Sequence, residues 1–350
     1  MDVSSVPHHL AFAALLLFVS ISITYCMQKV QIIALPNHRS SHDEPTPSSG
    51  GVAIVLTTTG GFLYSVFFLD FQGGLLIQII VLIVGSLVVA IVGFIDDLGR
   101  LPNFKIKFLS QIFAVLILFG GNLVFEKLEL PFVGLIDLGW WGYVVTFVWV
   151  IGVTNAFNFM DGLNGMAGGT AVVAALFFAL ISLDQNAVTV FVLSYIVLAA
   201  ALGFLPFNFP RPRIFMGDVG SQYLGFFFAG LGVLAAGDNS TQIPFWVMPL
   251  IFFHFIFDTS FTFLRRLCAG EVVTDAHRSH LYQLVNRMGW PHSKVSIFYA
   301  SMAILQGFAA IWLMGSSVSS KGAVFLSFFI VVCISFIYSV RICGRHGEDF

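Results

Sequence analysis

The stretch Asn155-Ala-Phe-Asn-Phe-Met-Asp-Gly-Leu-Asn-Gly165 decides how the rest of the chain is interpreted. It places Asn155, Asn158 and Asp161 at three-residue intervals at the end of a very apolar segment. Side chains three residues apart on a helix are neighbours, so the pattern predicts a narrow polar stripe. Such a stripe is costly in a hydrophobic protein unless it faces water, a metal ion or a polar substrate. The stretch therefore indicates a functional site at the end of a helix.

The composition around this stretch is typical of a membrane protein. Hydrophobic residues make up 58% of the 350 residues and charged residues only 10%, whereas soluble proteins carry about 25% charged residues. A membrane-spanning helix needs about 20 apolar residues. We therefore expect one all-α membrane domain over 1–350, with about eleven transmembrane helices. Apolar runs that predict these helices lie at 10–27, 50–69, 75–95, 105–125, 140–157, 166–183, 187–207, 220–236, 243–264, 295–315 and 322–341.

The basic residues predict the orientation of the chain. When alternate loops are assigned to one side, 14 of the 16 Lys and Arg residues fall together, and only Lys127 and Lys321 fall opposite. Cytoplasmic loops carry an excess of Lys and Arg, so we place the N-terminus outside and the C-terminus in the cytoplasm. The same assignment puts every polar cluster on the cytoplasmic face, namely 29–49, 96–107, 155–165, 208–219 and 266–294. We expect a functional site on that cytoplasmic face.

Two adjacent aspartates predict a magnesium site. Asp96 and Asp97 end the third apolar segment, and Asp218 stands apart from them, where the eighth segment begins. Mg²⁺ typically takes one or two carboxylates together with substrate phosphates, and Mn²⁺ is the alternative ion. Acidic residues at a helix C-terminus oppose the helix dipole, which disfavours a merely solvated helix end for the first two. Asp218 could instead be an ordinary N-cap.

Cations and amides adjoin these carboxylates. Asn208, Arg211 and Arg213 precede Asp218, and such groups beside a helix N-terminus can form a phosphate cradle. Lys107 follows the aspartate pair at the start of the fourth segment. It either contacts a phosphate at the level of the lipid headgroups or anchors the helix on the cytoplasmic side.

Histidines supply the remaining candidates. His277, Arg278 and His280 share a cytoplasmic loop and could stabilise phosphate oxyanions, with a solvated loop as the alternative. A zinc site is disfavoured because no third soft ligand accompanies them. His254 and Asp258 stand four residues apart within the ninth segment. They could form a proton relay or a hydrogen-bonded pair that packs helices.

Together, these motifs resemble the polyprenyl-phosphate N-acetylhexosamine-1-phosphate transferase family, glycosyltransferase family 4. Asn164 departs from the pattern, because many members carry a second acidic residue there. The loop Asp275-Ala-His-Arg-Ser-His280 replaces a run of adjacent histidines and is similar to the O-antigen-initiating branch. The resembling motifs are Glu44-Pro-Thr-Pro-Ser-Ser-Gly-Gly51, Gly93-Phe-Ile-Asp-Asp97, Lys107-Phe-Leu-Ser-Gln111, Asn155-Ala-Phe-Asn-Phe-Met-Asp-Gly162, Asn208 with Phe215-Met-Gly-Asp-Val-Gly-Ser221, and the histidine loop.

The resemblance implies transfer of a sugar 1-phosphate from a UDP-N-acetylhexosamine to undecaprenyl phosphate, with release of UMP. It implies Asp218 as the metal ligand, Asp96 and Asp97 as catalytic carboxylates, and Lys107 as the catalytic contact of the lipid phosphate. It also implies donor contacts, with Asn155, Asn158 and Asp161 on the nucleotide side, His277 and His280 as catalytic groups at the pyrophosphate, and Asn208 and Arg278 as substrate-binding residues.

Alternatives remain at the level of mechanism and of function. A phosphate monoester is mostly dianionic at neutral pH, so we favour direct attack by the lipid phosphate, with a covalent aspartyl intermediate at the aspartate pair as the alternative. A proton-coupled transporter is the rival function, although transporters usually place such groups near the midplane, often in repeats. A non-catalytic lipid-binding member is a third. A homodimer is left open, and no nucleic-acid partner is expected.

Overall fold

The computed structural model describes residues 6–30, 32–34, 45–68, 71, 73–101, 103–130, 133–237, 243–272 and 277–345. All eleven apolar segments predicted from the sequence are helical. The helices are α1 (Val6–Met27), α2 (Gly51–Phe68), α3 (Gly73–Asp97), α4 (Phe104–Gly120), α5 (Trp141–Phe159), α6 (Met166–Asp184), α7 (Val188–Asn208), α8 (Asp218–Gly237), α9 (Val247–Ile251), α10 (Phe253–Cys268), α11 (Leu281–Arg287), α12 (His292–Leu313) and α13 (Val318–Arg345).

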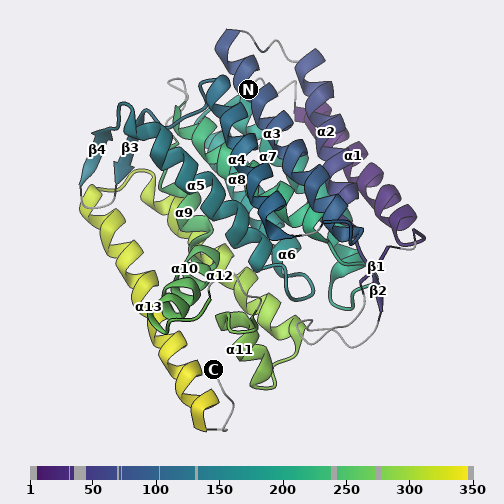
Figure 1. Cartoon of the computed structure of the whole chain (residues 1–350). Coiled ribbons are helices and arrows are strands. Elements are labelled where there is room, and N and C mark those ends of the chain that lie inside the picture. Colours follow the sequence, from purple (N-terminus) through teal and green to yellow (C-terminus); the bar gives the residue numbers. More distant parts are fainter. Residues whose placement is uncertain are drawn as a thin grey trace.

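Seven of the described helices are long and apolar enough to cross a membrane: α1, α3, α5, α6, α7, α8 and α12. The chain is therefore a helical multi-pass membrane protein. Figure 1 shows α1 beginning at one end of the bundle and α13 ending at the other. The count of about eleven crossings and the orientation stay predictions.

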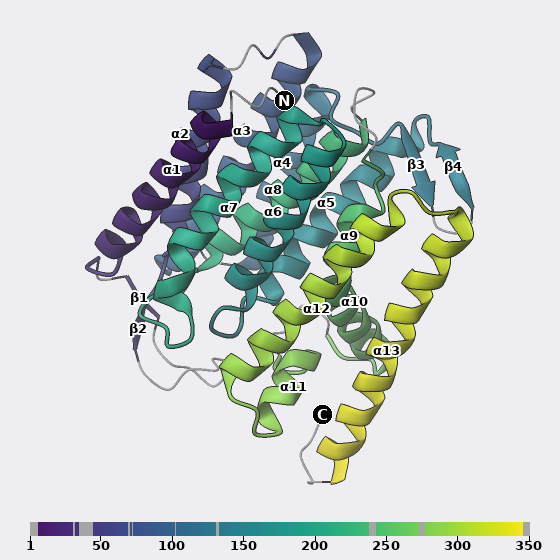
Figure 2. The ribbon, with the colours of Figure 1, turned by 180° about the vertical axis from the view of Figure 1, so that it is seen from behind.

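The structure departs from the predicted elements in two places. The ninth apolar segment is two helices, α9 and α10, that meet at Phe252. Two short antiparallel hairpins also interrupt the all-α pattern: β1 (Ile33–Ala34) with β2 (Thr46–Pro47), and β3 (Lys127–Leu130) with β4 (Gly134–Asp137). In Figure 2 the second hairpin lies beside the start of α13.

Helix α8 forms the centre of the core. It packs against α2, α3 and α5, and nearly all of its side chains are buried. Other helices lie in front of it in both views of the bundle (Figures 1 and 2). A helix that is apolar on all sides is stable only when it is surrounded. Asp218, the first residue of α8, is therefore positioned at the end of the most enclosed element of the protein.

Close backbone contacts bring the predicted clusters together at this end. A Cβ added to Gly93 on α3 would lie 2.6 Å from the Asp218 carbonyl oxygen. A Cβ added to Gly51, at the start of α2, would overlap the backbone of Gly220. The glycines thus let α2 and α3 approach the first turn of α8 more closely than residues with side chains could. This approach carries the aspartate pair at the end of α3 to Asp218.

Candidate active site

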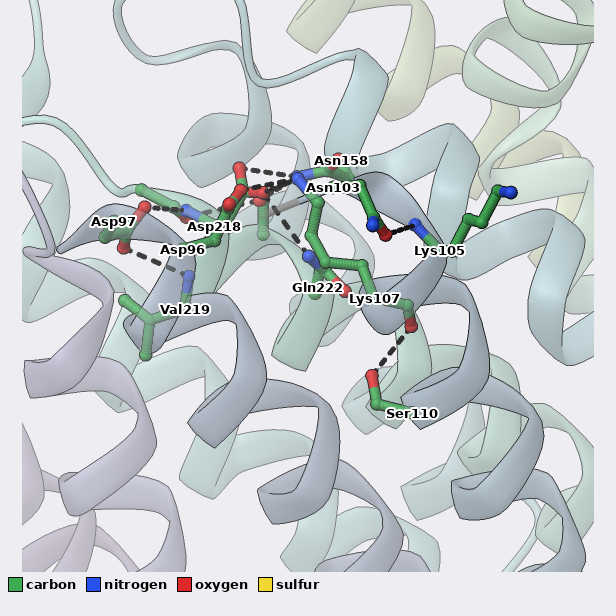
Figure 3. A network of polar contacts seen from close by, with 12 residues as sticks. Asp96, Asp97, Asn103, Lys105, Lys107, Ser110, Asn158, Asp218, Val219 and Gln222 are labelled. Carbon is green, nitrogen blue, oxygen red and sulfur yellow. Dashed lines mark hydrogen bonds and ion pairs between the residues drawn. The ribbon is translucent and has the colours of Figure 1, made fainter. Parts of the chain in front are cut away.

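Lys107 lies between two carboxylates from different helices. Its Nζ is 2.6 Å from Asp96 Oδ2 on α3 and 2.7 Å from Asp218 Oδ2 on α8 (Figure 3). All three side chains are about a quarter to a third exposed. Charge-assisted contacts of this length are among the stronger polar interactions in proteins. Lys107, which was predicted to contact the lipid phosphate, therefore also joins α4 to α3 and α8 through Asp96 and Asp218.

Asp97 caps the N-terminus of α8. Its Oδ1 accepts the backbone N–H of Asp218 at 2.8 Å, and its Oδ2 accepts that of Val219 at 3.3 Å and the Ser49 hydroxyl at 3.1 Å. A carboxylate is favoured there by the free N–H groups and the helix dipole. Gly217 has φ +76°, and a Cβ on it would overlap the Asp97 carboxylate. The sequence allowed Asp218 to be the N-cap of α8. In the structure Asp97 accepts the free N–H groups at the start of that helix instead.

Asn158 holds the Asp218 carboxylate in place. Its Nδ2 donates to Asp218 Oδ1 at 3.0 Å and to the Ser221 hydroxyl at 2.8 Å. Gln222 Nε2 makes a longer contact of 3.4 Å with Asp218 Oδ2. Gln222 was missed from the sequence, although its position four residues after Asp218 places it on the same helix face. Both amides orient the aspartate that was predicted to bind the metal.

Asn155 lies away from the carboxylates, in a cluster of amides. Its Nδ2 donates to Gln111 Oε1 at 2.7 Å, and Gln111 Nε2 reaches Gln222 Oε1 at 3.3 Å. Asn155 is absent from the lining of the cavity described next. The predicted polar stripe is therefore divided: Asn158 touches the site directly, while Asn155 connects α4, α5 and α8 behind it.

A cavity of about 290 Å³ opens beside the carboxylates. Asp161 lines it from the loop between α5 and α6, and within the described residues no group donates a hydrogen bond to its carboxylate. Burial, followed by the charges of Asp218 and Asp97, raises the pKa of Asp161 well above its usual value. The full lining is Ser48, Asp97, Asn158, Asp161, Gly162, Leu163, Asn164, Asn208, Phe215, Met216, Gly217, Asp218, Gln283 and His292.

The charges around this cavity suit a divalent cation. Asp97, Asp161 and Asp218 line it, Asp96 adjoins it, and Lys107 supplies one positive charge among them. Within the described part of the chain, His, Cys, Asp and Glu form no ready-made group of three metal ligands. Mg²⁺ needs no such group, because it keeps several waters and binds one or two carboxylates with substrate phosphates. The donor set therefore fits a magnesium ion that arrives with a phosphorylated substrate.

Both polar groups of the Asn208 side chain are hydrogen-bonded to the backbone. It is 4% exposed; its Oδ1 accepts the N–H of Gly165 at 2.7 Å, and its Nδ2 donates to the Ile214 carbonyl at 3.0 Å. These bonds tie the start of α6 to the loop that precedes α8. The structure thus places this predicted substrate-binding residue on the cavity wall with its polar groups holding two loops together.

The predicted histidines His277 and His280 are absent from the lining of the cavity and lie next to each other at the start of α11. His280 is 5% exposed, and its Nδ1 is 3.1 Å from Asp258 Oδ1. The His277 ring lies 5.0 Å from that of His280. Burial, followed by the charges of His280 and Arg266, lowers the pKa of His277 to about 4, so His277 is neutral at neutral pH. Among the described residues, Arg278 shares this loop, whereas Glu44 and Asp275 of the resembling motifs lie outside the described residues.

Two cavity residues were not predicted, and His254 and Asp258 contact different partners. Gln283 and His292 reach the cavity from α11 and the start of α12, and only their place in the polar segment 266–294 could have signalled them. His254 Nδ1 instead meets Gln306 Oε1 on α12 at 2.7 Å. Asp258 faces His280. Among the described residues the two side chains thus bond to different partners and not to each other, and the proton relay stays a hypothesis.

Comparison with known proteins supplies the family. The model of the Glycosyl transferase family 4 matches residues 79–236. A Bacillus subtilis (strain 168) protein named probable undecaprenyl-phosphate N-acetylglucosaminyl 1-phosphate transferase is 30% identical, over 92% of this chain and 87% of that protein. The decaprenyl-phosphate N-acetylglucosaminephosphotransferase of Mycobacterium leprae (strain TN) is 28% identical, over 87% of this chain and 82% of that protein.

A relative with a different printed substrate is also similar. The phospho-N-acetylmuramoyl-pentapeptide-transferase of Staphylococcus saprophyticus is 28% identical, over 77% of this chain and 85% of that protein. The match to the Bacillus protein covers 92% of this chain, and the residues matched by the family model include Asp96, Asp97 and Asp218. This chain therefore belongs to glycosyl transferase family 4, the family of polyprenyl-phosphate sugar-1-phosphate transferases.

Proposed function

We propose that this protein transfers an N-acetylhexosamine 1-phosphate from a UDP-sugar to undecaprenyl phosphate and releases UMP. The reaction uses Mg²⁺ and starts O-antigen or a related surface glycan at the cytoplasmic face of the bacterial inner membrane. The observation that carries the proposal is the Lys107 ammonium between Asp96 and Asp218, beside a cavity that Asp97 and Asp161 line. Two of the relatives named above are N-acetylglucosamine enzymes by name, which makes UDP-N-acetylglucosamine the first donor to test.

The chemistry requires two anions to meet. The lipid phosphate is mostly dianionic at neutral pH and hardly needs a base, so the protein has to reduce repulsion and hold geometry. Lys107 offers its Nζ to the lipid phosphate, and Asn158 keeps Asp218 oriented. Asp218 would hold Mg²⁺, with the Asp161 carboxylate free to join it. When bound, the ion would neutralise the donor diphosphate.

The geometry favours direct attack over a covalent aspartyl intermediate. A lipid phosphate oxygen bonds to the sugar-bearing phosphorus while the bridging bond to UMP breaks. Asp97 is poorly suited as a nucleophile, because its oxygens already accept two backbone N–H groups and the Ser49 hydroxyl. Asp96 is paired with Lys107. Hydrogen bonds to a carboxylate stabilise its charge and lower its reactivity.

The arrangement offers less support for a transporter. Asp97 ends α3 and Asp218 begins α8, so the carboxylates lie at helix ends. Transporters usually bind their substrates near the bilayer midplane, between broken helices. The third candidate, a non-catalytic lipid-binding protein, would need neither the Lys107 geometry nor a cavity lined by carboxylates.

The test is to identify the released nucleotide. Purified protein in detergent is mixed with undecaprenyl phosphate, Mg²⁺ and either UDP-N-acetylglucosamine, UDP-N-acetylgalactosamine or UDP-N-acetylmuramoyl-pentapeptide. We expect UMP, dependent on lipid and metal, and lost in Asp218→Asn. Asp184→Asn, at the exposed end of α6, serves as the matched control and should retain activity. Release of UDP would contradict sugar-phosphate transfer, and no release from any donor by folded protein would favour the transporter.

A further inference from the structure

Asp258 is the most heavily hydrogen-bonded side chain near the histidine loop. It lies on α10 and is 1% exposed. Its Oδ1 is 3.1 Å from His280 Nδ1 and accepts the backbone N–H of Leu281 at 2.9 Å. Its Oδ2 accepts the backbone N–H of Tyr282 at 3.2 Å and the Tyr299 hydroxyl at 2.9 Å. One buried carboxylate therefore joins α10, α11 and α12.

Only a carboxylate can accept all the hydrogen bonds that the neighbouring donors offer at this position. Two backbone N–H groups and the Tyr299 hydroxyl already point at Asp258. An ionised carboxylate accepts at both oxygens, whereas an asparagine would turn an NH₂ group toward one set of donors. Since the carboxylate only accepts, the hydrogen of the contact with His280 is on Nδ1. Asp258 thus fixes both the orientation of the His280 ring and the start of α11.

The first turn of α11 in turn holds the loop that carries Asp161. The Tyr282 hydroxyl donates to the Phe159 carbonyl at 2.9 Å, from a side chain that is 1% exposed. A Cβ added to Gly162 would overlap that hydroxyl, so the loop backbone rests directly on Tyr282. The Ser296 hydroxyl of α12 donates to the Asn164 carbonyl at 2.7 Å. Side chains of α11 and α12 therefore hold the backbone of the Asp161 loop in place.

We propose that Asp258 is a positioning residue that sets, through α11 and Tyr282, where the Asp161 loop stands relative to Asp218. The backbone N–H of Tyr282 is bonded to Asp258, and the hydroxyl of the same residue is bonded to Phe159, two residues before Asp161. A displacement of α11 is thereby transmitted to the cavity wall. The consequence for the reaction rests on the proposed function, whereas the mechanical coupling does not.

Hydrogen–deuterium exchange of the intact protein in detergent tests the coupling itself. Asp258→Asn should speed amide exchange about tenfold or more in both 277–287 and 159–166, because local opening becomes easier when buried donors lose their acceptor. Tyr282→Phe should speed exchange in 159–166 and leave 277–287 as in the wild type. Tyr223→Phe is the matched control, since its buried hydroxyl meets Thr58 at 2.7 Å, and it should change neither segment.

The kinetic test separates positioning from general stability. Tyr282→Phe should raise KM for the UDP-sugar about two- to tenfold, the effect of losing one hydrogen bond, and leave KM for undecaprenyl phosphate unchanged. A residue that merely stabilises the fold would lower the active fraction and leave both KM values unchanged. If Asp258→Asn fails to fold, Tyr299→Phe removes one donor from the same carboxylate and should speed exchange in 277–287.

The two tests fail in different ways. Unchanged exchange in 159–166 in Tyr282→Phe and in Asp258→Asn would overturn the coupling, whatever the activity. If the wild-type protein releases no UMP from any donor, the proposed function fails and the exchange result still decides the coupling. Faster exchange together with an unchanged KM for the donor would overturn the effect on the reaction.

Discussion

Asp97 and Asp258 perform the same local task in two different surroundings. Each accepts two consecutive backbone N–H groups at the start of a helix, from residues 218–219 at α8 and from residues 281–282 at α11. Asp97 lines the cavity and faces the carboxylates of Asp161 and Asp218. Asp258 is buried and faces donors from three helices.

The difference shows that the surroundings decide what a carboxylate does. Around Asp97 the carboxylates outnumber the single ammonium of Lys107, and an excess of like charges is costly until a further cation enters. Around Asp258 the hydrogen-bonding capacity is filled, and such a network rigidifies the elements it joins. We therefore expect one site to be tuned for binding and reaction and the other to be tuned for position.

The largest expected effect contrasts the same substitution at the two positions. Asp97→Asn should lower turnover about 10²- to 10³-fold, the range for losing one electrostatic group at a reacting centre. Its loss of stability should be small, because the hydrogen bond that asparagine cannot accept is offset by removing one of three like charges that line the cavity. Asp258→Asn should show the opposite pattern, with a large fall in the apparent Tm and a small fall in turnover. UMP release and thermal unfolding of both variants measure this. Loss of fold in Asp97→Asn with wild-type stability in Asp258→Asn would break the comparison.

Lys107→Met tests the charge balance on the Asp97 side. It leaves Asp96 and Asp218 without their ammonium partner and removes the proposed contact of the lipid phosphate. We expect kcat/KM for undecaprenyl phosphate to fall about 10- to 100-fold, the effect of losing a charge-assisted hydrogen bond. Lys105→Met, on the exposed first turn of the same helix, is the control. Equal losses in both variants would mean that the effect is membrane anchoring.

Gly162→Ala sharpens the comparison on the Asp258 side. The added methyl group would overlap the Tyr282 hydroxyl, and overpacking costs about 1–3 kcal/mol. Part of that cost should disappear in Gly162→Ala combined with Tyr282→Phe, a non-additive result that a double-mutant cycle in apparent stability detects. Gly169→Ala, where an added Cβ meets nothing within 4 Å, should be neutral. Strict additivity would argue against the contact.

The smallest expected effect is a pH dependence from Asp161. Its pKa in the folded protein is raised above the ordinary value of 3.8, so the native state holds the proton more tightly than the unfolded chain. The contribution of Asp161 is complete below about pH 4 and is lost as pH rises through the raised pKa. Asp161→Asn should match the wild type in acid and have a slightly higher apparent Tm at pH 8 without divalent ions. A difference independent of pH would contradict this account.

The sequence predicted the converging clusters because their signals are local. Asp96, Asp97 and Asp218 stand at the ends of apolar runs, where charged groups in a membrane protein require an explanation. Gln222 and Tyr282 carry no comparable signal. Gln222 is one amide inside a buried helix, and the importance of Tyr282 lies in its contact with Phe159, 123 residues away in the chain.

By itself the sequence determined the membrane class, the helical segments and the polar clusters, because hydrophobicity and spacing along one element are properties of the chain alone. Only the tertiary structure decided which polar groups became partners. It assigned the cap of α8 to Asp97, placed Lys107 between two helices, and directed Asp258 to His280 instead of His254. The physical reason is that hydrogen bonds form only within about 3 Å, and such distances are fixed by close approaches such as that at Gly93.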